Sequence, residues 1–311
     1  NPGWLRREAD GSITLQRNQA VLDFAAKGVA DHVFNVLTDL LSTYPISYLK
    51  WDMNRDLTGL DAEVRPGHAE YVRAVYDLIE RVRAAHPVVE IEACASGGGR
   101  MDYGMLSLTD RIWTSDSNDA LDRLEIQRNA ALFIPPEILG AHVGPATCHI
   151  TGRRLSLDLR AHVATFGHMG LELDLRALTP AELSRLSQHI ANYVRFRPLI
   201  HQGVILRLAF GDPDHSGLAA CEPDGDILAL VVRTGSARLG QGTSVRFPGL
   251  QPDAQYLIQA AHPITPTVEP CLAPAIAKDG VPLSGRILAA KGLDLFLPRP
   301  ETSVLLFLQK Q

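Results

Sequence analysis

The sequence predicts an α/β protein in which part of a (β/α)8 TIM-type barrel is followed by a small antiparallel β-sandwich. From residue 21 to about 200, short apolar segments alternate with segments of helical periodicity, a pattern typical of parallel strands joined by helices. After about residue 201 the helical periods disappear, and β-rich runs separated by Pro, Gly and Asp turns indicate antiparallel strands. We therefore expect a barrel domain over residues 1–200 and a sandwich domain over 201–311.

In the first domain, continuous apolar runs predict strands, and apolar residues spaced three and four apart predict helices. Strands are expected at 21–24, 46–52, 88–94, 111–116, 139–143 and 171–173, and helices at 29–41, 68–85, 120–133 and 157–166. A last helix begins at a capping box formed by Thr179 and Glu182, with Pro180 in its first turn. About six strands are fewer than a closed barrel needs, so either strands escape the pattern or the chain begins inside a barrel.

In the second domain, the same reasoning predicts short strands that pair through tight turns. These strands are expected at 227–232, 256–258, 293–297 and 304–308.

Composition narrows the class of protein. Hydrophobic residues make up 46% and charged residues 21% of the 311, and the formal net charge of −5 comes without a cluster of Lys or Arg, so no nucleic-acid partner is expected. No apolar run approaches the ~18 residues of a membrane span. The four cysteines lie far apart without a CxxC pair, and no signal peptide opens the chain, which together favour a reduced, cytoplasmic setting.

Two aspartates stand where apolar strands end, Asp52 and Asp116. A carboxylate is a poor strand former and costly to bury alone, and the carboxyl ends of parallel strands meet at the mouth of a barrel. Two carboxylates at that mouth are the minimum for hydrolysing a glycosidic bond. Lys50 points to the same side as Asp52 and would keep it ionised. The alternative reading of such an aspartate is a helix N-cap, and Asp119 is a rival to Asp116.

Three segments together resemble the α-galactosidases of glycoside hydrolase family 36. They are Lys50–Arg55 (KWDMNR), Glu92–Arg100 (EACASGGGR) and Trp113–Asp116 (WTSD), and segments 17–19, 140–143 and 149–153 follow the family's order. The resemblance implies a retaining hydrolase of terminal α-galactosides, such as melibiose and raffinose, that works through a covalent galactosyl-aspartate and needs no cofactor. It also implies that a large β-sandwich and the first barrel strands precede Asn1, so that this chain corresponds to the C-terminal part of such an enzyme.

The resemblance assigns Asp52 as the nucleophile and Asp116 as the general acid and base. Substrate-binding positions implied in the same way are Arg17, Lys50, Trp51, Asn54, Cys94, Ser96, Gly97, Trp113 and Asp119. No metal ion is expected. The expected partners are an α-galactoside oligosaccharide and a second copy of the chain, with no nucleic acid and no membrane.

Three alternatives remain open. Within the family, an α-N-acetylgalactosaminidase or a galactosyl-transferring enzyme would use the same covalent intermediate. A metal-dependent barrel hydrolase would use Asp116, Asp119, His142 and His149. A non-catalytic truncated fragment would bind sugar without turning it over.

Overall fold

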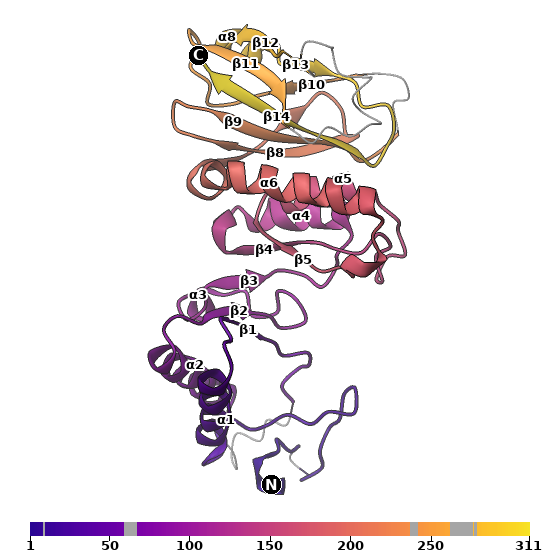
Figure 1. The fold of residues 1–311 in the computed structure, drawn as a ribbon. Helices are drawn as coiled ribbons and strands as arrows, with labels where there is room; N and C mark the ends of the chain where they lie inside the picture. The colour runs from indigo at the N-terminus through magenta and orange to yellow at the C-terminus, as the bar shows by residue number, and fades with distance from the viewer. Residues whose placement is uncertain (9, 59–66, 237–241, 262–275, 277–278) are drawn as a thin grey trace. The chain divides into compact units, whose positions relative to one another are not determined.

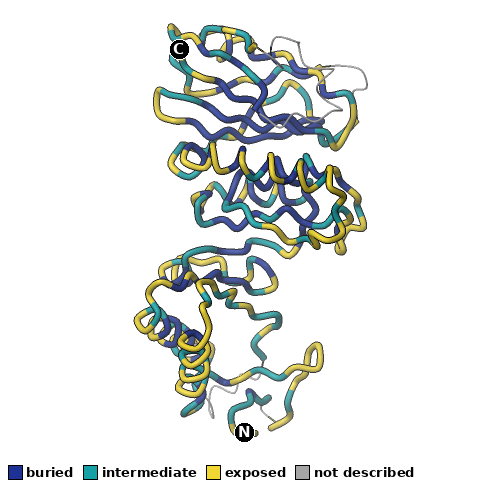
Figure 2. Tube along the Cα trace, in the orientation of Figure 1, coloured by how far each residue is buried: buried dark blue, intermediate teal, exposed yellow. Residues whose placement is uncertain are grey.

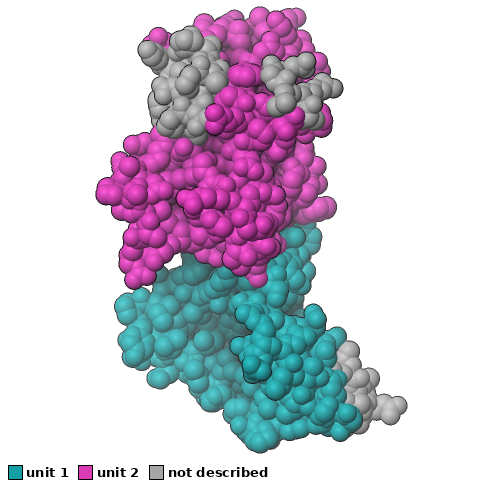
Figure 3. Space-filling model, turned by 90° about the vertical axis from the view of Figure 1, so that its right-hand side faces the viewer, with its two compact units in different colours: residues 1–113 teal, residues 114–311 magenta. Residues whose placement is uncertain are grey.

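A computed structural model describes residues 1–8, 10–58, 67–236, 242–261, 276 and 279–311. The chain forms two compact units, Asn1–Trp113 and Thr114–Gln311 (Figure 3). Parallel strands alternating with helices occupy the first part of the chain and antiparallel strands the last part, so the predicted mixed α/β class is confirmed. The predicted domain boundary at residue 200 stays a prediction.

Unit 1 consists of helices and a short parallel sheet (Figure 1). Its elements are η1 (Pro2–Trp4), α1 (Val29–Thr43), β1 (Tyr48–Trp51), α2 (His68–Ala85), β2 (Glu90–Ala93), α3 (Tyr103–Leu106) and β3 (Arg111–Trp113). β2 pairs in parallel with β1 on one side and with β3 on the other. The carboxyl ends of these strands therefore open onto the same edge of the sheet.

Periodicity predicted both long helices of this unit. On α2 the spacing predicts an apolar face in which Val75, Ile79 and Val82 are indeed buried, whereas Val72 is 38% exposed. On α1, the three-and-four spacing predicts a buried face that includes Val36 and Leu40, but these residues are 52% and 39% exposed. That expectation was wrong because periodicity identifies the apolar face of a helix but not what packs on it.

In unit 1, one strand prediction was wrong and another was correct only in part. Residues 21–24 form no strand, and Leu22 makes only an isolated bridge to Leu5. The strand expected at 111–116 ends at Trp113, so Asp116 lies in the following loop rather than at the strand end. A strand is defined by its hydrogen-bonded partner, which an apolar run alone does not supply.

Unit 2 continues the alternation of helices and parallel strands and then turns antiparallel. Its first elements are α4 (Ala120–Ala130), η2 (Pro136–Ile138), β4 (Leu139–Val143), α5 (Leu157–Ala164), β5 (His168–Leu171), η3 (Leu175–Ala177) and α6 (Pro180–Gln202). β4 and β5 pair in parallel. The strand predicted at 171–173 overlaps β5 only at its last residue, whereas the capping box of Thr179 and Glu182 is confirmed.

The remaining elements are the strands of two antiparallel sheets and a short helix. They are β6 (Val204–Arg207), β7 (Ala209–Phe210), β8 (His215–Cys221), β9 (Ile227–Arg233), β10 (Thr243–Arg246), β11 (Gln255–Ala260), β12 (Val281–Ser284), α8 (Gly285–Ala290), β13 (Leu293–Leu295) and β14 (Thr302–Lys310). The larger sheet has the order β12-β11-β14-β9-β8-β6, and the smaller one β13-β10-β7. All four predicted strands of this region are present, while β6, β7, β8, β10 and β12 were missed.

The central strands of the larger sheet are buried on both faces, which explains why most of their residues are apolar. Every residue of β8 and β9 is buried, and both strands are dark along their length in Figure 2. One face packs against α5 and α6, with Leu159 and Phe196 in the same cluster as Leu230. The other face shares a cluster with the smaller sheet, in which Val231 and Val245 take part. Such double coverage removes the alternating pattern expected of a half-exposed strand.

A partly buried polar cluster joins α5 to α6 in unit 2. The Asp158 carboxylate accepts hydrogen bonds from His189 Nε2 at 2.6 Å and Arg185 Nε at 2.7 Å. Burial alone would raise the pKa of Asp158, but the bonds from His189 and Arg185 outweigh burial and lower the pKa to about 2. Because the folded pKa lies below the ordinary value of 3.8, the charged carboxylate stabilises the folded state above pH 4.

We expect Asp158→Asn to lower the free energy of unfolding at pH 7 by about 2 kcal/mol, the equivalent of the pKa shift. The parent protein should lose this stability as the pH falls from about 4 to 2, and the variant should not. Urea denaturation across this pH range measures both effects. Asp174→Asn is the control, because the ion pair of Asp174 with Arg176 is exposed. Equal pH dependence in Asp158→Asn and the parent would contradict the assignment.

In the part of the chain that the structure describes, no helix has the length and apolar character needed to cross a membrane. The three described cysteines, Cys94, Cys148 and Cys221, are buried and form no disulfide. Cys271 lies outside the described residues.

Candidate active site

Asp52 follows β1 directly, as the sequence predicted, and its side chain is held by its own loop. Its Oδ1 accepts a hydrogen bond from the backbone N–H of Met53 at 2.8 Å, and Oδ2 accepts one from Asn54 Nδ2 at 2.6 Å. The Cys94 thiol, at the end of the neighbouring strand β2, also hydrogen-bonds to the carboxylate. The residue itself remains exposed. An oriented carboxylate that is still accessible is suited to attack on a substrate.

These contacts set the charge of Asp52. Partial burial acts to raise its pKa, but the hydrogen bonds from Cys94, Asn54 and the Met53 amide, together with the positive charge of Lys50, outweigh burial and hold the pKa below its ordinary value. Asp52 is therefore ionised at neutral pH, and the predicted influence of Lys50 is one of the causes.

Cys94 is a hydrogen-bond donor and not a second nucleophile. Burial and the neighbouring Asp52 carboxylate raise the pKa of its thiol to about 11. A thiol with this pKa stays protonated at neutral pH, so its S–H is available to the carboxylate.

The loop after β2 is tight and contacts the Asp52 loop. Gly97 has a φ of 84°, a conformation that favours glycine, and a Cβ on Gly99 would lie 2.6 Å from the carbonyl oxygen of Ala95. This turn brings Ser96 Oγ to within 3.4 Å of Asn54 Oδ1. The glycine run therefore shapes the loop beside the carboxylate.

Lys50 is anchored on the sheet by a buried acid. Its Nζ lies 3.4 Å from Glu92 Oε1 and 5.0 Å from the centre of the Trp113 ring. The Glu92 carboxylate also accepts a hydrogen bond from the Tyr48 hydroxyl at 2.6 Å. The Lys50 side chain is still 38% exposed, so its ammonium group can reach a ligand, whereas Trp113 is almost fully buried at 2%.

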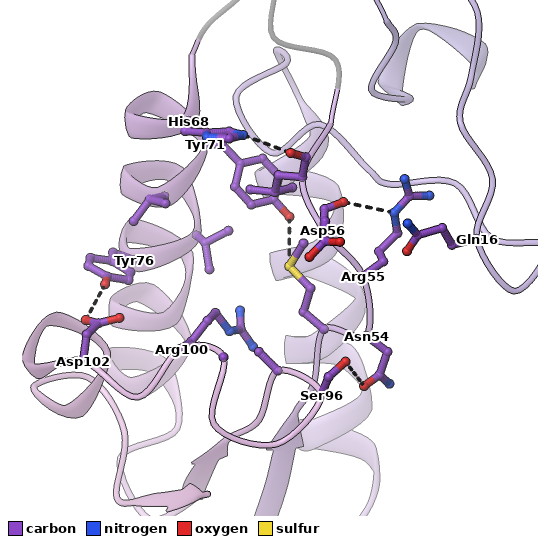
Figure 4. A pocket seen from close by; sticks show the side chains of 16 residues that line it. Gln16, Asn54, Arg55, Asp56, His68, Tyr71, Tyr76, Ser96, Arg100 and Asp102 are labelled. Carbon is purple, nitrogen blue, oxygen red and sulfur yellow. Dashed lines mark hydrogen bonds between the residues drawn. The ribbon is translucent and has the colours of Figure 1, made fainter. Parts of the chain in front are cut away.

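Two hollows flank the Asp52 loop within unit 1. A shallow groove of about 260 Å³ runs along the edge of β1 and includes Lys50, Trp51 and Asp52. A larger cavity of about 740 Å³ is lined by residues that follow Asp52, and Figure 4 shows Asn54 and Arg55 with Tyr71, Tyr76 and Arg100 around it. Asp52 lines the first hollow together with Lys50, and its hydrogen-bond partners Met53 and Asn54 line the second.

Asp116 lies in the loop between β3 and α4, in unit 2, with intermediate exposure. Arg123, buried on α4, fixes this loop by donating to the carbonyl oxygen of Ser115 at 3.0 Å and to that of Gly140 at 2.7 Å. The backbone of the loop is thereby tied to β4.

Asp119 is the N-cap of α4. Its Oδ1 accepts hydrogen bonds from the backbone of Leu121 at 2.9 Å and from Arg153 Nη1 at 2.7 Å, and its Oδ2 accepts one from Thr151 Oγ1 at 2.6 Å. Burial acts to raise its pKa, but these bonds and the charge of Arg153 outweigh burial and lower it. A carboxylate with a lowered pKa and a fully buried side chain is a poor proton donor, which weakens the case for Asp119 as the rival acid.

Two residues of the metal-hydrolase alternative, Asp119 and His142, are engaged in other contacts. His142 Nδ1 lies 2.9 Å from Glu172 Oε2, and Asp119 is bonded as described. Over the described ranges of the chain, no group of three or more His, Cys, Asp or Glu side chains is arranged to hold a metal ion.

The structure thus gathers six predicted positions of unit 1 around the ends of β1 and β2: Lys50, Trp51, Asp52, Asn54, Cys94 and Ser96. Gly97 shapes the second loop, Trp113 lies under Lys50, and Arg17 is exposed at a tight turn elsewhere in the same unit.

Sequence reasoning missed two supporting residues. Glu92 holds Lys50, and Arg100 Nη2 donates to the carbonyl oxygens of Trp51 at 3.0 Å and Cys94 at 2.6 Å, which bridges the ends of β1 and β2. A charged residue within an apolar strand was the available signal for Glu92. Arg100 ends the motif Glu92–Arg100, but its role could not be predicted from that motif, because its acceptors are backbone atoms.

Known proteins resemble this chain along its whole length. An α-galactosidase of Escherichia coli is 35% identical over 317 aligned residues, which are 100% of this chain and 45% of that protein. The α-galactosidase AgaA of Geobacillus stearothermophilus is 36% identical over 214 residues, 67% of this chain and 29% of that protein. The chain therefore spans less than half the length of these relatives.

Solved structures agree with this similarity. The crystal structure of the family 36 (GH36) α-galactosidase AgaA from Geobacillus stearothermophilus covers 100% of this chain with a TM-score of 0.88 and 28% identity, and the chain covers 42% of it. A substituted form of AgaA in complex with raffinose gives the same TM-score and coverage. The predicted resemblance to family 36 α-galactosidases is confirmed.

The Melibiase family profile matches residues 1–203, which include every predicted site residue. Together with the relatives above, this match shows that the chain belongs to the Melibiase family.

Proposed function

We propose that the protein containing this chain is a retaining α-galactosidase that hydrolyses terminal α-galactosides of the melibiose and raffinose type. The observation that carries the proposal is the Asp52 carboxylate, oriented by Asn54, Met53 and Cys94 and kept ionised, in a chain of the Melibiase family. The complex of the related AgaA with raffinose supports the substrate class.

The proposed reaction proceeds in two displacements. In the first, an oxygen of Asp52 attacks the anomeric carbon, the bond to the leaving oxygen breaks, and that oxygen takes the proton of the Asp116 carboxyl. In the second, Asp116 takes a proton from water, the water oxygen attacks the anomeric carbon, and the ester bond to Asp52 breaks. Lys50 and Arg17 bind sugar hydroxyls in this scheme, and Trp51, Asn54, Cys94, Ser96, Gly97 and Trp113 form the surroundings of the sugar.

The proposal includes the architecture that brings the two acids together. Residues 1–200 contribute parallel strands to a (β/α)8 barrel, and residues 201–311 form a β-sandwich beside it. A retaining mechanism requires the carboxyl groups of Asp52 and Asp116 to lie about 5–5.5 Å apart, whereas about 6.5–9.5 Å would indicate inversion. A crystal structure of the protein as its gene encodes it would measure this separation.

The reaction itself is tested by the stereochemistry of the first product. Proton NMR of raffinose hydrolysis should show α-galactose forming first and the β-anomer appearing only by mutarotation. Release of β-galactose first would overturn the retaining mechanism, and absence of galactose release would overturn the proposed activity. Adding an acceptor sugar, or an α-N-acetylgalactosaminide as substrate, separates hydrolysis from the two related activities.

Asn54→Ala should move the acidic limb of the kcat/KM profile to higher pH. The limb reports protonation of Asp52, and loss of the Asn54 bond removes one of the contacts that favour the charged carboxylate. Asn35→Ala, at an exposed position of α1, is the control and should leave the limb in place. A limb that stays in place or moves to lower pH in Asn54→Ala would contradict the role given to Asn54.

We also propose that the protein is located in the cytoplasm and that it associates with copies of itself. Cell fractionation and light scattering of the purified protein test these two points.

A further inference from the structure

A strained two-residue turn carries Arg17. Gln16 and Gln19 exchange both backbone hydrogen bonds, at 3.2 and 2.9 Å, and Arg17 and Asn18 form the turn between them. Both turn residues have positive φ, 53° and 59°. Turns of this kind normally use Asn-Gly, because a positive φ strains a residue that has a long side chain. Such a conformation persists only when neighbouring groups hold it.

Arg55 supplies that support from the loop of the nucleophile. Its Nη1 donates to the carbonyl oxygen of Thr14 at 2.7 Å and to that of Gln19 at 2.9 Å, so that one guanidinium holds the chain on both sides of the turn. Its Nε donates to the carbonyl oxygen of Asp56 at 3.3 Å, which fixes the side chain on its own loop. Figure 4 shows Arg55 beside Gln16, the first residue of the turn.

This arrangement links two parts of the site that are far apart in sequence. Arg55 stands three positions after Asp52, and the bonds of its guanidinium reach 41 and 36 residues back along the chain. We propose that Arg55 is a positioning residue, which fixes the Arg17 turn relative to Asp52 so that both groups meet the same galactosyl unit. This inference rests on the proposed function, in which Asp52 is the nucleophile and Arg17 a sugar ligand.

The chemistry of the side chain explains why an arginine serves here. A guanidinium has several N–H donors in one rigid plane, so it can serve carbonyl groups on different segments at once. A lysine at this position has one nitrogen, at a different distance from the backbone. Arg55→Lys should therefore hold the Arg17 turn in part, and Arg55→Ala should not hold it.

A double-mutant cycle tests the inference in the protein as its gene encodes it. We expect Arg17→Ala and Arg55→Ala each to lower kcat/KM for raffinose on the order of 10- to 100-fold, because misplacement of a binding group costs as much as this. If Arg55 acts through Arg17, the double variant should be no more than about threefold worse than Arg17→Ala. Arg55→Lys should lie between Arg55→Ala and the parent. A role limited to stability would give multiplied losses instead.

The matched control is Arg7→Ala. Arg7 also donates to backbone carbonyl oxygens nearby, those of Gly11 at 2.8 Å and Pro2 at 3.4 Å, but it does not hold the Arg17 turn. Its kcat/KM should equal that of the parent. If Arg55→Ala does not fold, as judged by circular dichroism, the cycle is carried out with Arg55→Lys in its place.

The outcomes separate this inference from the proposed function. Unchanged kcat/KM in the Arg55 variant, or losses that multiply with those of Arg17→Ala, would overturn the positioning role while leaving the proposed reaction intact. An active Asp52→Ala enzyme would overturn the proposed reaction, and the positioning role with it.

Discussion

Asp52→Ala is expected to abolish turnover, with kcat for raffinose reduced on the order of 10⁵-fold, as when the nucleophile of another covalent mechanism is removed. Asn54, Met53 and Cys94 would remain, but no carboxylate oxygen would be left to form the covalent intermediate. Steady-state rates on raffinose and on nitrophenyl α-galactoside measure the loss. Asp39→Ala, at an exposed position of α1, is the control and should be fully active.

Azide should restore turnover to Asp52→Ala and reveal the geometry of attack. The small anion fits the space left by the carboxylate and attacks the anomeric carbon from the same side, so the product should be β-galactosyl azide. NMR of the product identifies the anomer. Recovery of α-galactosyl azide would exchange the roles of Asp52 and its partner acid, and full activity of the variant without azide would exclude Asp52 as the nucleophile.

Asp116→Ala should slow the reaction of substrates with poor leaving groups far more than that of substrates with good ones. Raffinose needs a proton on its departing oxygen, so its kcat should fall about 10²–10⁴-fold, the usual contribution of a general acid. Nitrophenolate leaves without protonation, so formation of the intermediate from nitrophenyl α-galactoside should be affected far less. Pre-steady-state release of nitrophenol and steady-state rates on raffinose measure the difference.

Asp119→Ala is the matched comparison for Asp116. Because Asp119 caps α4 and pairs with Arg153, its loss should lower the stability of the protein by about 1 kcal/mol or more and affect both substrates alike. Equal losses on both substrates in Asp116→Ala, with the leaving-group effect appearing in Asp119→Ala, would move the acid role to Asp119.

Local sequence patterns predicted most elements of the fold. Apolar periodicity identified α1 and α2, and the capping box located the start of α6. The strands were harder to predict than the helices, because a strand forms only when it is hydrogen-bonded to a neighbouring strand. The apolar run at 21–24 makes one isolated β-bridge and no strand pairing. The small residues of β8 did not predict a strand, although β8 is buried between helices on one face and a second sheet on the other.

The sequence by itself determined the position of Asp52 directly after a strand and the presence of Lys50 two residues before it, because strand alternation is a local property. Only the tertiary structure decided that Asp119 bonds to Thr151 and Arg153, and that Arg55 holds the turn of Arg17. These contacts join residues more than thirty positions apart, many of them through backbone carbonyl groups that every residue possesses. Local spacing therefore cannot indicate them, since they depend on how the folded chain brings distant segments together.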